Sequence, residues 1–339
     1  MKNKLALQTF FPSEDHPLFS SLPGKIYPAS LFALQKAGDT INPEFAAAGI
    51  AVTNENNETL GRLVLYANTG IRYNGKKTAI AGNYECVDDA GASLLLLESA
   101  AAFAKKEGFH ILLGPANGTT WDTYRFCTGD LQELFFSEMV NLPYYPAQWK
   151  NAGFGVAAKY VSTIDHSLKC DGEEVLAIEK KFLGSGFRIR NIDIAQYENE
   201  LELLFPFLER SFAGNFLYTP VSREIFLKKY TAVKPYLDPR SVFIAENPVG
   251  NPVAVAFCFP DHLNKKEKRL IVKTLARDPD PRYKGLGEVL GNLSQRFAKQ
   301  NGYEAVIHAL MYTENYSLKL SGNYAGKIFR EYELYSKEL

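Results

Sequence analysis

The hydrophobic pattern of this chain predicts alternating strands and helices. The clearest stretch lies between residues 270 and 310. It begins with an apolar run at 270–276 that is typical of a buried strand. Apolar residues then recur at helical spacing over 286–300, and Asn301-Gly302 is a typical helix end. A second apolar run at 305–310 follows. We therefore expect a unit of strand, glycine-containing loop, helix and strand.

The rest of the chain follows a similar order. Polar residues 54–59 separate two strand-like runs and predict a hairpin, and a second hairpin is predicted across 247–251. Residues 1–40 are irregular, with a short helix expected from about residue 30. The predicted strands are 45–53, 60–67, 78–87, 109–115, 187–193, 241–246 and 253–259, the predicted helices are 90–107 and 197–212, and 149–154 and 157–164 are predicted as closing strands.

A repeat relates the two parts at an offset of 194 residues. The matched positions are Gly91 and Gly285, Leu96 and Leu290, Phe103 and Phe297, Ala104 and Ala298, Lys105 and Lys299, and Gly108 and Gly302. Any two amphipathic helices that end in glycine could match this well, but the preceding hairpins correspond too. We therefore predict a duplicated α/β unit. The expected first half is 1–165, the linker is 166–185 and the second half is 186–339.

The loop before helix 286–300 has the composition of an anion-binding site. Gly285 and Gly287 leave the backbone N–H groups uncovered, and Arg282 and Lys284 add positive charge. Because the first N–H groups of a helix lack internal partners and carry the positive end of its dipole, a phosphate or pyrophosphate would bind there. The alternative is a tight turn with two solvated cations.

The spacing R-x-x-G-x-G resembles motif A of the GNAT acyltransferase superfamily, in which this loop holds the pyrophosphate of acetyl-CoA. The segment around Asn315 and the late strand-like run 330–335 also resemble the end of a GNAT domain. The resemblance implies two tandem GNAT-like domains with mixed α/β sheets. It also implies the cofactor-binding residues, which are Leu275, Ala276, Arg277, Arg282, Tyr283, Lys284, Gly285, Leu286, Gly287 and Asn315.

The first half lacks the charges of this loop. Asp88, Ala90 and Ser93 stand at the positions of Arg282, Lys284 and Gly287. A carboxylate repels the phosphate that arginine attracts, so we expect the first half to be degenerate. This leaves one acyl-CoA site per chain, in the second half.

Catalysis by direct attack of an amine on the thioester needs a base and an acid. His308 lies on the strand that would flank the cofactor, and it is the candidate base, although a lone histidine on an apolar strand is more often structural. Many members of the superfamily carry a tyrosine acid seven residues after the asparagine, but here Gly322 stands there. Tyr324 is the candidate acid instead, with Tyr312 or Tyr316 as alternatives.

A second cluster of polar and aromatic residues follows the predicted strand 109–115. Asn117, Trp121, Asp122 and Arg125 lie within one short loop, which suits a polar acceptor substrate. Trp121 would stack, Asp122 would hold an amine and Arg125 a carboxylate. The alternative is a structural loop in which Asp122 pairs with Arg125 and Trp121 fills the seam between the halves.

Composition excludes several other classes of protein. The 339 residues contain 38 basic and 38 acidic residues, which argues against a nucleic-acid partner. The four cysteines have no metal-ligand spacing, so we expect reduced thiols, no metal and a cytoplasmic location. The apolar runs are too short for a signal peptide or a membrane span, so no membrane partner is expected.

The resemblance to the GNAT superfamily, taken with these features, implies an acyl-CoA-dependent N-acyltransferase, most simply one that uses acetyl-CoA on a small-molecule amine or peptide. One alternative is a Fem-type aminoacyl-tRNA-dependent transferase, which also has a tandem GNAT-like fold. The other is a non-catalytic protein that binds CoA or another ligand. The acceptor and the oligomeric state stay open.

Overall fold

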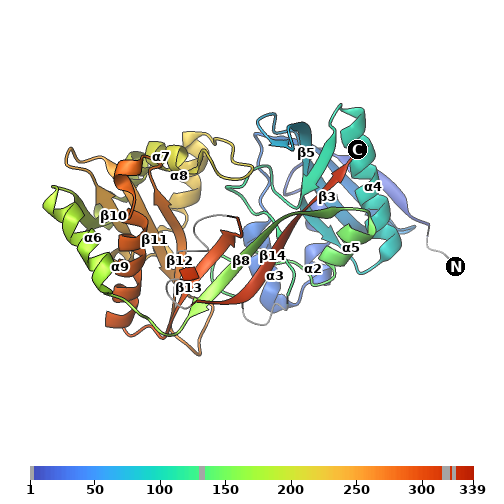
Figure 1. Cartoon of the computed structure of the whole chain (residues 1–339). Coiled ribbons are helices and arrows are strands. Elements are labelled where there is room, and N and C mark those ends of the chain that lie inside the picture. The colour runs from blue at the N-terminus through green and yellow to red at the C-terminus, as the bar shows by residue number, and fades with distance from the viewer. Residues whose placement is uncertain (1–3, 130–133, 315–320, 323–325) are drawn as a thin grey trace.

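A computed structural model describes residues 4–129, 134–314, 321–322 and 326–339 of the chain. Its described strands form a long mixed sheet that runs through the whole molecule, in the order β1-β2-β3-β5-β6-β14-β8-β13-β12-β11-β10-β9. Figure 1 shows the two halves side by side, with β8 and β14 passing between them. The sheet therefore joins the halves instead of separating them.

The first half consists of a sheet covered by α4 on one face. The antiparallel strands β1, β2, β3 and β5 follow one another, and β5 then pairs in parallel with β6 through the crossover helix α4. Residues of α4 and the sheet share one hydrophobic core with Trp149 and Tyr335. The elements are β1 (Ala6–Phe10), α1 (Pro17–Ser20), α2 (Pro23–Ile26), α3 (Ala29–Gly38), β2 (Ala46–Thr53), β3 (Thr59–Tyr66), β4 (Arg72–Tyr73), β5 (Lys76–Cys86), α4 (Ala90–Lys106), β6 (Ile111–Gly114), β7 (Phe126–Cys127), α5 (Tyr145–Asn151) and β8 (Gly155–Asp165).

The second half repeats this plan with helices on both faces. Strands β9, β10, β11 and β12 are antiparallel, and β12 pairs in parallel with β13 through α9. Helices α6 and α9 pack against each other, whereas α7 and α8 form a separate pair. The elements are α6 (Glu173–Gly184), β9 (Arg188–Asn191), α7 (Tyr197–Phe212), α8 (Arg223–Thr231), β10 (Phe243–Glu246), β11 (Pro252–Pro260), β12 (Arg269–Arg277), α9 (Leu286–Gln300), β13 (Ala305–Tyr312) and β14 (Lys327–Glu338).

The repeat extends to the hydrogen bonds that end the two crossover helices. Phe109 N donates to Ala104 O at 3.1 Å, and Tyr303 N donates to Ala298 O at 3.0 Å. The glycine that precedes each donor has positive φ, 75° at Gly108 and 70° at Gly302. Glycine adopts this conformation without strain, so both helices end by the same turn.

The halves exchange their closing strands. β14, from the end of the second half, pairs with β6 of the first half, and β8 of the first half pairs with β13 of the second. β8 and β14 also pair with each other from Gly155 to Ile164. Each half is therefore completed by a strand from the other half.

Most of the predicted elements are present, and one prediction is wrong. Residues 149–151 end helix α5 and do not form a closing strand, because Pro146 starts a helix and Gly153, with φ of 83°, redirects the chain after it. Strand β1 and helix α8 were not expected. The predicted linker 166–185 contains α6, and the division at residue 165 falls at the end of β8.

Candidate functional site

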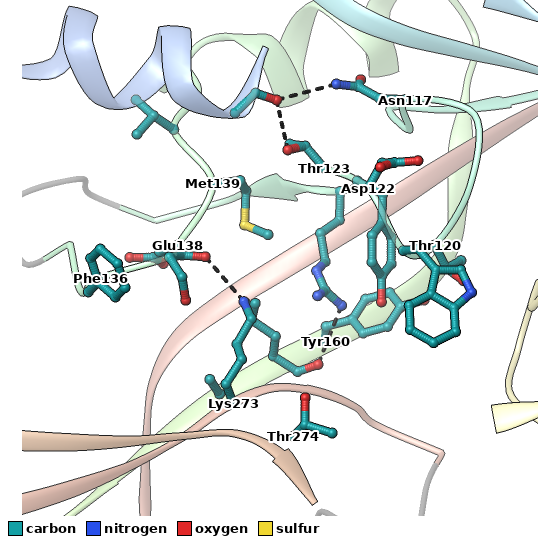
Figure 2. Close-up of a pocket in the computed structure, with 18 of the residues that line it drawn as sticks. Asn117, Thr120, Asp122, Thr123, Phe136, Glu138, Met139, Tyr160, Lys273 and Thr274 are labelled. Atoms are coloured by element: carbon teal, nitrogen blue, oxygen red, sulfur yellow. Dashed lines mark hydrogen bonds between the residues drawn. The ribbon is translucent and has the colours of Figure 1, made fainter. Parts of the chain in front are cut away.

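A cavity of about 790 Å³ lies between the two halves and opens beside the divergent ends of β12 and β13. Its walls come from the C-terminal end of α3, the segment 115–126, residues 136–141, helix α8 and strands β12 and β13. Figure 2 shows Lys273 reaching from β12 toward the segment that carries Phe136, Glu138 and Met139. A volume of this size is typical of small-molecule sites.

Strands β12 and β13 separate at Lys273. Their parallel ladder ends at the pair Val272 and His308. On the other side, β11 pairs Phe257 with Thr274 and Cys258 with Val272, so Lys273 is the extra residue of a β-bulge. A bulge leaves backbone groups outside the ladder, where they can bind a ligand. Val272 to Leu275 all line the cavity from this point.

The loop before α9 leaves the start of this helix without a side-chain cap. Gly285 precedes the helix with φ of 103° and provides no side-chain cap. A Cβ on Gly287 would meet no described atom within 4 Å, so the space around it is open. The Arg282 side chain is 78% exposed and forms an ion pair with Asp280, and Lys284 is also exposed. The helix N-terminus is thus uncapped, with two cations beside it.

The corresponding helix start in the first half is capped. The side chain of Asp89 precedes α4 and accepts a hydrogen bond from Ala92 N at 2.7 Å. The gap between β5 and β6 is also occupied by the chain itself, because Ala116 N donates to Ala81 O at 3.0 Å and Asn83 N donates to Asn117 Oδ1 at 2.8 Å. Neither the helix start nor the strand gap is available to a phosphate-bearing ligand here.

Known structures share the fold of this chain. The chain is similar over 99% of its length to a tandem GNAT protein from the clavulanic acid biosynthesis pathway, with a TM-score of 0.54, 12% identity and 98% of that chain covered. The fold is that of a tandem GNAT protein. A GCN5-related N-acetyltransferase from Sphaerobacter thermophilus matches 98% of this chain and 95% of its own, with a TM-score of 0.51 and 10% identity.

A third match concerns only part of a longer protein. It is the GCN5-related glucosamine N-acetyltransferase region of a fungal multi-domain GH3 β-N-acetylglucosaminidase, with a TM-score of 0.58 and 14% identity. The match covers 99% of this chain but only 38% of the fungal protein, so this chain spans less than half of that protein's length. No protein-family sequence model and no curated protein sequence match the chain. The comparisons therefore establish the fold, as the sequence analysis predicted.

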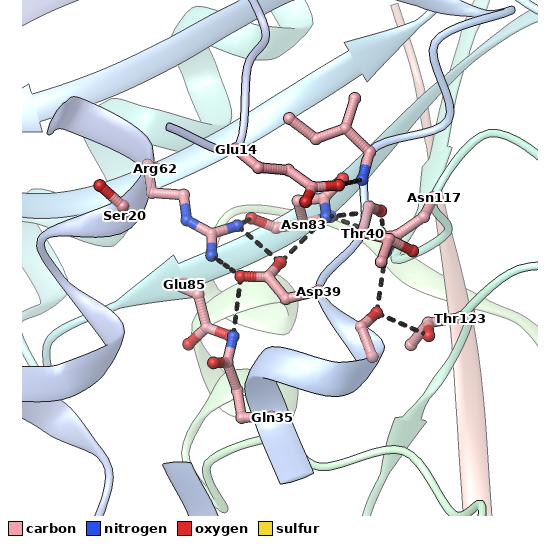
Figure 3. Close-up of polar contacts among 12 residues, drawn as sticks. Glu14, Ser20, Gln35, Asp39, Thr40, Arg62, Asn83, Glu85, Asn117 and Thr123 are labelled. Atoms are coloured by element: carbon pink, nitrogen blue, oxygen red, sulfur yellow. Dashed lines mark hydrogen bonds and ion pairs between the residues drawn. The ribbon is translucent and has the colours of Figure 1, made fainter. Parts of the chain in front are cut away.

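The first half of the tandem GNAT fold, in which the helix start is capped and the strand gap is occupied, contains a buried polar network (Figure 3). Arg62 is completely buried, and its guanidinium bonds to both carboxylate oxygens of Asp39. Asn83 Nδ2 donates to Asp39 Oδ1 at 2.9 Å, and Gln35 Nε2 donates to Glu85 at 2.8 Å. Burial raises the pKa of Glu85 to about 7. Gln35, Asp39, Asn83 and Glu85 also line the cavity, so this network forms part of its first-half wall.

Of the two predicted proton-transfer residues, the structure describes only His308. His308 lines the cavity at the end of the β12–β13 ladder, and burial lowers its pKa to about 4. It is therefore neutral near pH 7, and a base of that pKa is weak. Tyr324 and Asn315 lie outside the described residues. Both catalytic assignments stay predictions.

The tandem GNAT fold places all four predicted acceptor residues on the cavity wall, but two are committed to structural contacts. Asn117 Nδ2 donates to Thr40 O at 3.2 Å within the first half. The Trp121 indole N–H donates to Thr219 O at 3.2 Å, and its ring packs on Phe212 at 5.5 Å. Trp121 thus fills the seam between the halves.

Asp122 and Arg125 are not paired with each other. Asp122 Oδ2 accepts hydrogen bonds from Asn42 Nδ2 at 2.9 Å and from Thr119 Oγ1 at 2.8 Å. The Arg125 guanidinium lies 3.9 Å from the ring centroid of Tyr124 and 4.3 Å from that of Tyr160. Arg125 is only 5% exposed. Its charge is therefore held in an aromatic setting at the cavity wall.

The sequence analysis missed two lysines of the cavity wall, Lys229 on α8 and Lys273 on β12. Lys273 had a recognisable signal, because it is the one charged residue between Leu270 and Ala276 in an otherwise largely apolar strand. Lys229 had none, since it follows Lys228 on an ordinary amphipathic helix. Only the folded chain brings either lysine to Arg125.

Two searches of the described residues gave negative results. Within them, no group of three or more His, Cys, Asp or Glu side chains is arranged to hold a metal ion. None of the helices in this part of the chain combines the length and apolar composition needed to cross a bilayer.

Proposed function

We propose that this protein is an acyl-CoA-dependent N-acyltransferase with one cofactor site per chain, in its second half. The observation that supports this proposal most is the contrast between the two helix starts. The N-terminus of α9 is uncapped and has Arg282 and Lys284 beside it, whereas Asp89 caps the N-terminus of α4. With this contrast, the N-terminus of α9 would bind a pyrophosphate and the N-terminus of α4 would not.

The proposed site extends from this loop along β12. Arg282 to Gly287 would hold the pyrophosphate of acetyl-CoA, and Leu275, Ala276 and Arg277 would line its pantetheine arm. The acyl thioester would then lie at the bulge of Lys273, where the strands separate and the cavity opens. Backbone N–H groups at such a bulge can polarise the thioester carbonyl. The acceptor amine would enter from the cavity between the halves, and acetyl is the simplest acyl group to test.

Calorimetric titration of acetyl-CoA into the purified chain tests the cofactor site, with Arg282→Glu as the variant. The chain offers a matched control, because Asp238 and Arg240 form the same Asp-Pro-Arg turn as Asp280 and Arg282, with the arginine 68% exposed. We expect one site per chain that Arg282→Glu abolishes and Arg240→Glu leaves intact. No binding by the unsubstituted chain would refute the proposal. Binding without thiol release on any amine would favour a ligand-binding protein.

A further inference from the structure

Three cations line the same cavity from three separate elements. Arg125 follows β6, Lys229 lies on α8 and Lys273 forms the bulge of β12. The first comes from one half of the molecule and the other two from the other half. Because the three cations come from distant parts of the sequence, they are not a run of like charges along one exposed segment.

Among the described residues, Arg125 and Lys273 lack a close counter-ion, and Lys229 has only a long contact with Asp122. There, no carboxylate oxygen lies within 4.0 Å of the charged nitrogens of Arg125 or Lys273, and Lys229 Nζ is 3.9 Å from Asp122 Oδ1. Arg125 is 95% buried, yet its Nε has no hydrogen-bond acceptor in this part of the chain, and its Nη1 reaches Leu310 O only at 3.4 Å. A buried charge left without a full set of partners is costly, and a bound anion would reduce that cost.

The nearest carboxylates are engaged elsewhere. Glu138 Oε1 accepts hydrogen bonds from Arg330 Nε at 2.8 Å and from the Tyr332 hydroxyl at 2.5 Å. Asp122 accepts from an amide and a hydroxyl, as described above. The Nζ of Lys273 donates to a neutral acceptor, Ser137 O, at 3.1 Å. The positive charge on this wall is thus only partly compensated.

The ionisation of Lys273 reflects this environment. Burial, together with the positive charges of Arg125 and Lys229, lowers its pKa to about 7, against the opposing charge of Glu138. His308, on the adjoining strand, is neutral near pH 7 because its own pKa is about 4. Arg125 and Lys229 therefore both repel a proton from Lys273, and a bound anion would offset that repulsion.

We propose that Arg125, Lys229 and Lys273 form a subsite for an acidic group, so that the acceptor amine also carries a carboxylate or a phosphate. The role of this group as part of an acceptor rests on the proposed transferase function, whereas anion binding itself does not. Both acids offer the oxygens that guanidinium and ammonium groups bind. Their shared chemistry makes the acceptor an amino acid or an aminoalkyl phosphate.

The anion subsite can be tested without catalysis, by following the titration of Lys273 by NMR in protein labelled with ¹³C-lysine. Lys273→Met assigns the signal, and the probes are sodium acetate and inorganic phosphate, with chloride holding the ionic strength constant. We expect a bound anion to raise the pKa of Lys273 by about one unit or more. The rise should be smaller in Lys229→Gln and unchanged in Lys228→Gln, whose lysine lies on the same helix but not on the cavity wall. A pKa that neither anion changes would overturn the subsite.

Transfer assays test the acceptor class and separate its failure from that of the proposed function. With acetyl-CoA present, matched pairs are compared: phenylalanine with phenethylamine, and phosphoethanolamine with ethanolamine. We expect the acidic member of one pair to have a kcat/KM about tenfold higher or more, and Lys229→Gln to reduce that preference. A preference for the members that lack the acidic group would contradict the proposal.

The same assays assign Lys273. If Lys273→Met lowers kcat and leaves the preference for the acidic member intact, then Lys273 is not part of the subsite. If neither pair is acetylated, that counts against the proposed function, and the NMR titration still decides whether the anion subsite exists.

Discussion

Replacing Lys273 by methionine should stabilise the protein in the absence of ligand. The lysine pKa falls from an ordinary 10.5 to about 7, which corresponds to about 4.8 kcal/mol at roughly 1.36 kcal/mol per pKa unit. Solvent in the cavity screens part of this cost, and methionine loses the bond to Ser137 O. We therefore expect a gain of roughly 2–3 kcal/mol at about pH 6, where the folded lysine is charged.

The gain should shrink as the pH rises. Between about pH 7 and 10.5 the unfolded chain holds a proton on Lys273 that the folded chain does not, so the unsubstituted protein becomes more stable relative to the variant. By about pH 9 the difference should fall to roughly 1 kcal/mol. Above the unfolded pKa it should reflect only packing and the lost hydrogen bond.

Urea unfolding followed by tryptophan fluorescence at several pH values measures this difference, because Trp121 and Trp149 both lie within cores or seams. Lys228→Met is the control, since Lys228 is exposed and its replacement should change stability by less than about 0.5 kcal/mol at every pH. A Lys273→Met variant that is less stable than the unsubstituted protein by the same amount at every pH would refute the reasoning. Lys273 would then be an ordinary packed side chain.

Two further substitutions test the closed first half. Asp89→Ala removes the cap on Ala92 N and should cost about 1 kcal/mol in thermal or urea unfolding, whereas Asp88→Ala should cost almost nothing; equal effects would argue against the cap. Arg62→Met leaves Asp39 without its buried partner and should cost about 3–5 kcal/mol by the same measurement. A loss below about 1 kcal/mol would mean that the network is solvated.

The parts of the fold that follow from local pattern could be predicted. The helix at 286–300 was expected from apolar spacing and its closing glycine, and the structure has α9 at Leu286–Gln300. Strand β12 was expected from its apolar run and spans Arg269–Arg277. In both cases the residues that define the element are neighbours in sequence, so one window holds the whole signal.

The parts of the fold that depend on distant partners could not be predicted from the sequence. The apolar pattern of β14 is the same whichever strand it joins, so nothing in it predicts pairing with β6. The pattern of α5 was mistaken for a strand because its few apolar residues fit either period. The place of Lys229 in the cavity wall could not be predicted for the same reason as the strand exchange. Only the tertiary structure brings it near Arg125 and Lys273.

The exchange of β8 and β14 affects how the chain must fold. Lys76 and Glu338 form an ion pair across 262 residues of sequence, and the sheet is continuous only after β14 has joined β6 of the first half. Pairing over such distances slows folding, because a large loop has to close before the contacts form. The two halves should therefore reach their native state late and together. The cavity wall would form in that same step, because Arg125 meets Lys229 and Lys273 only after the halves have docked.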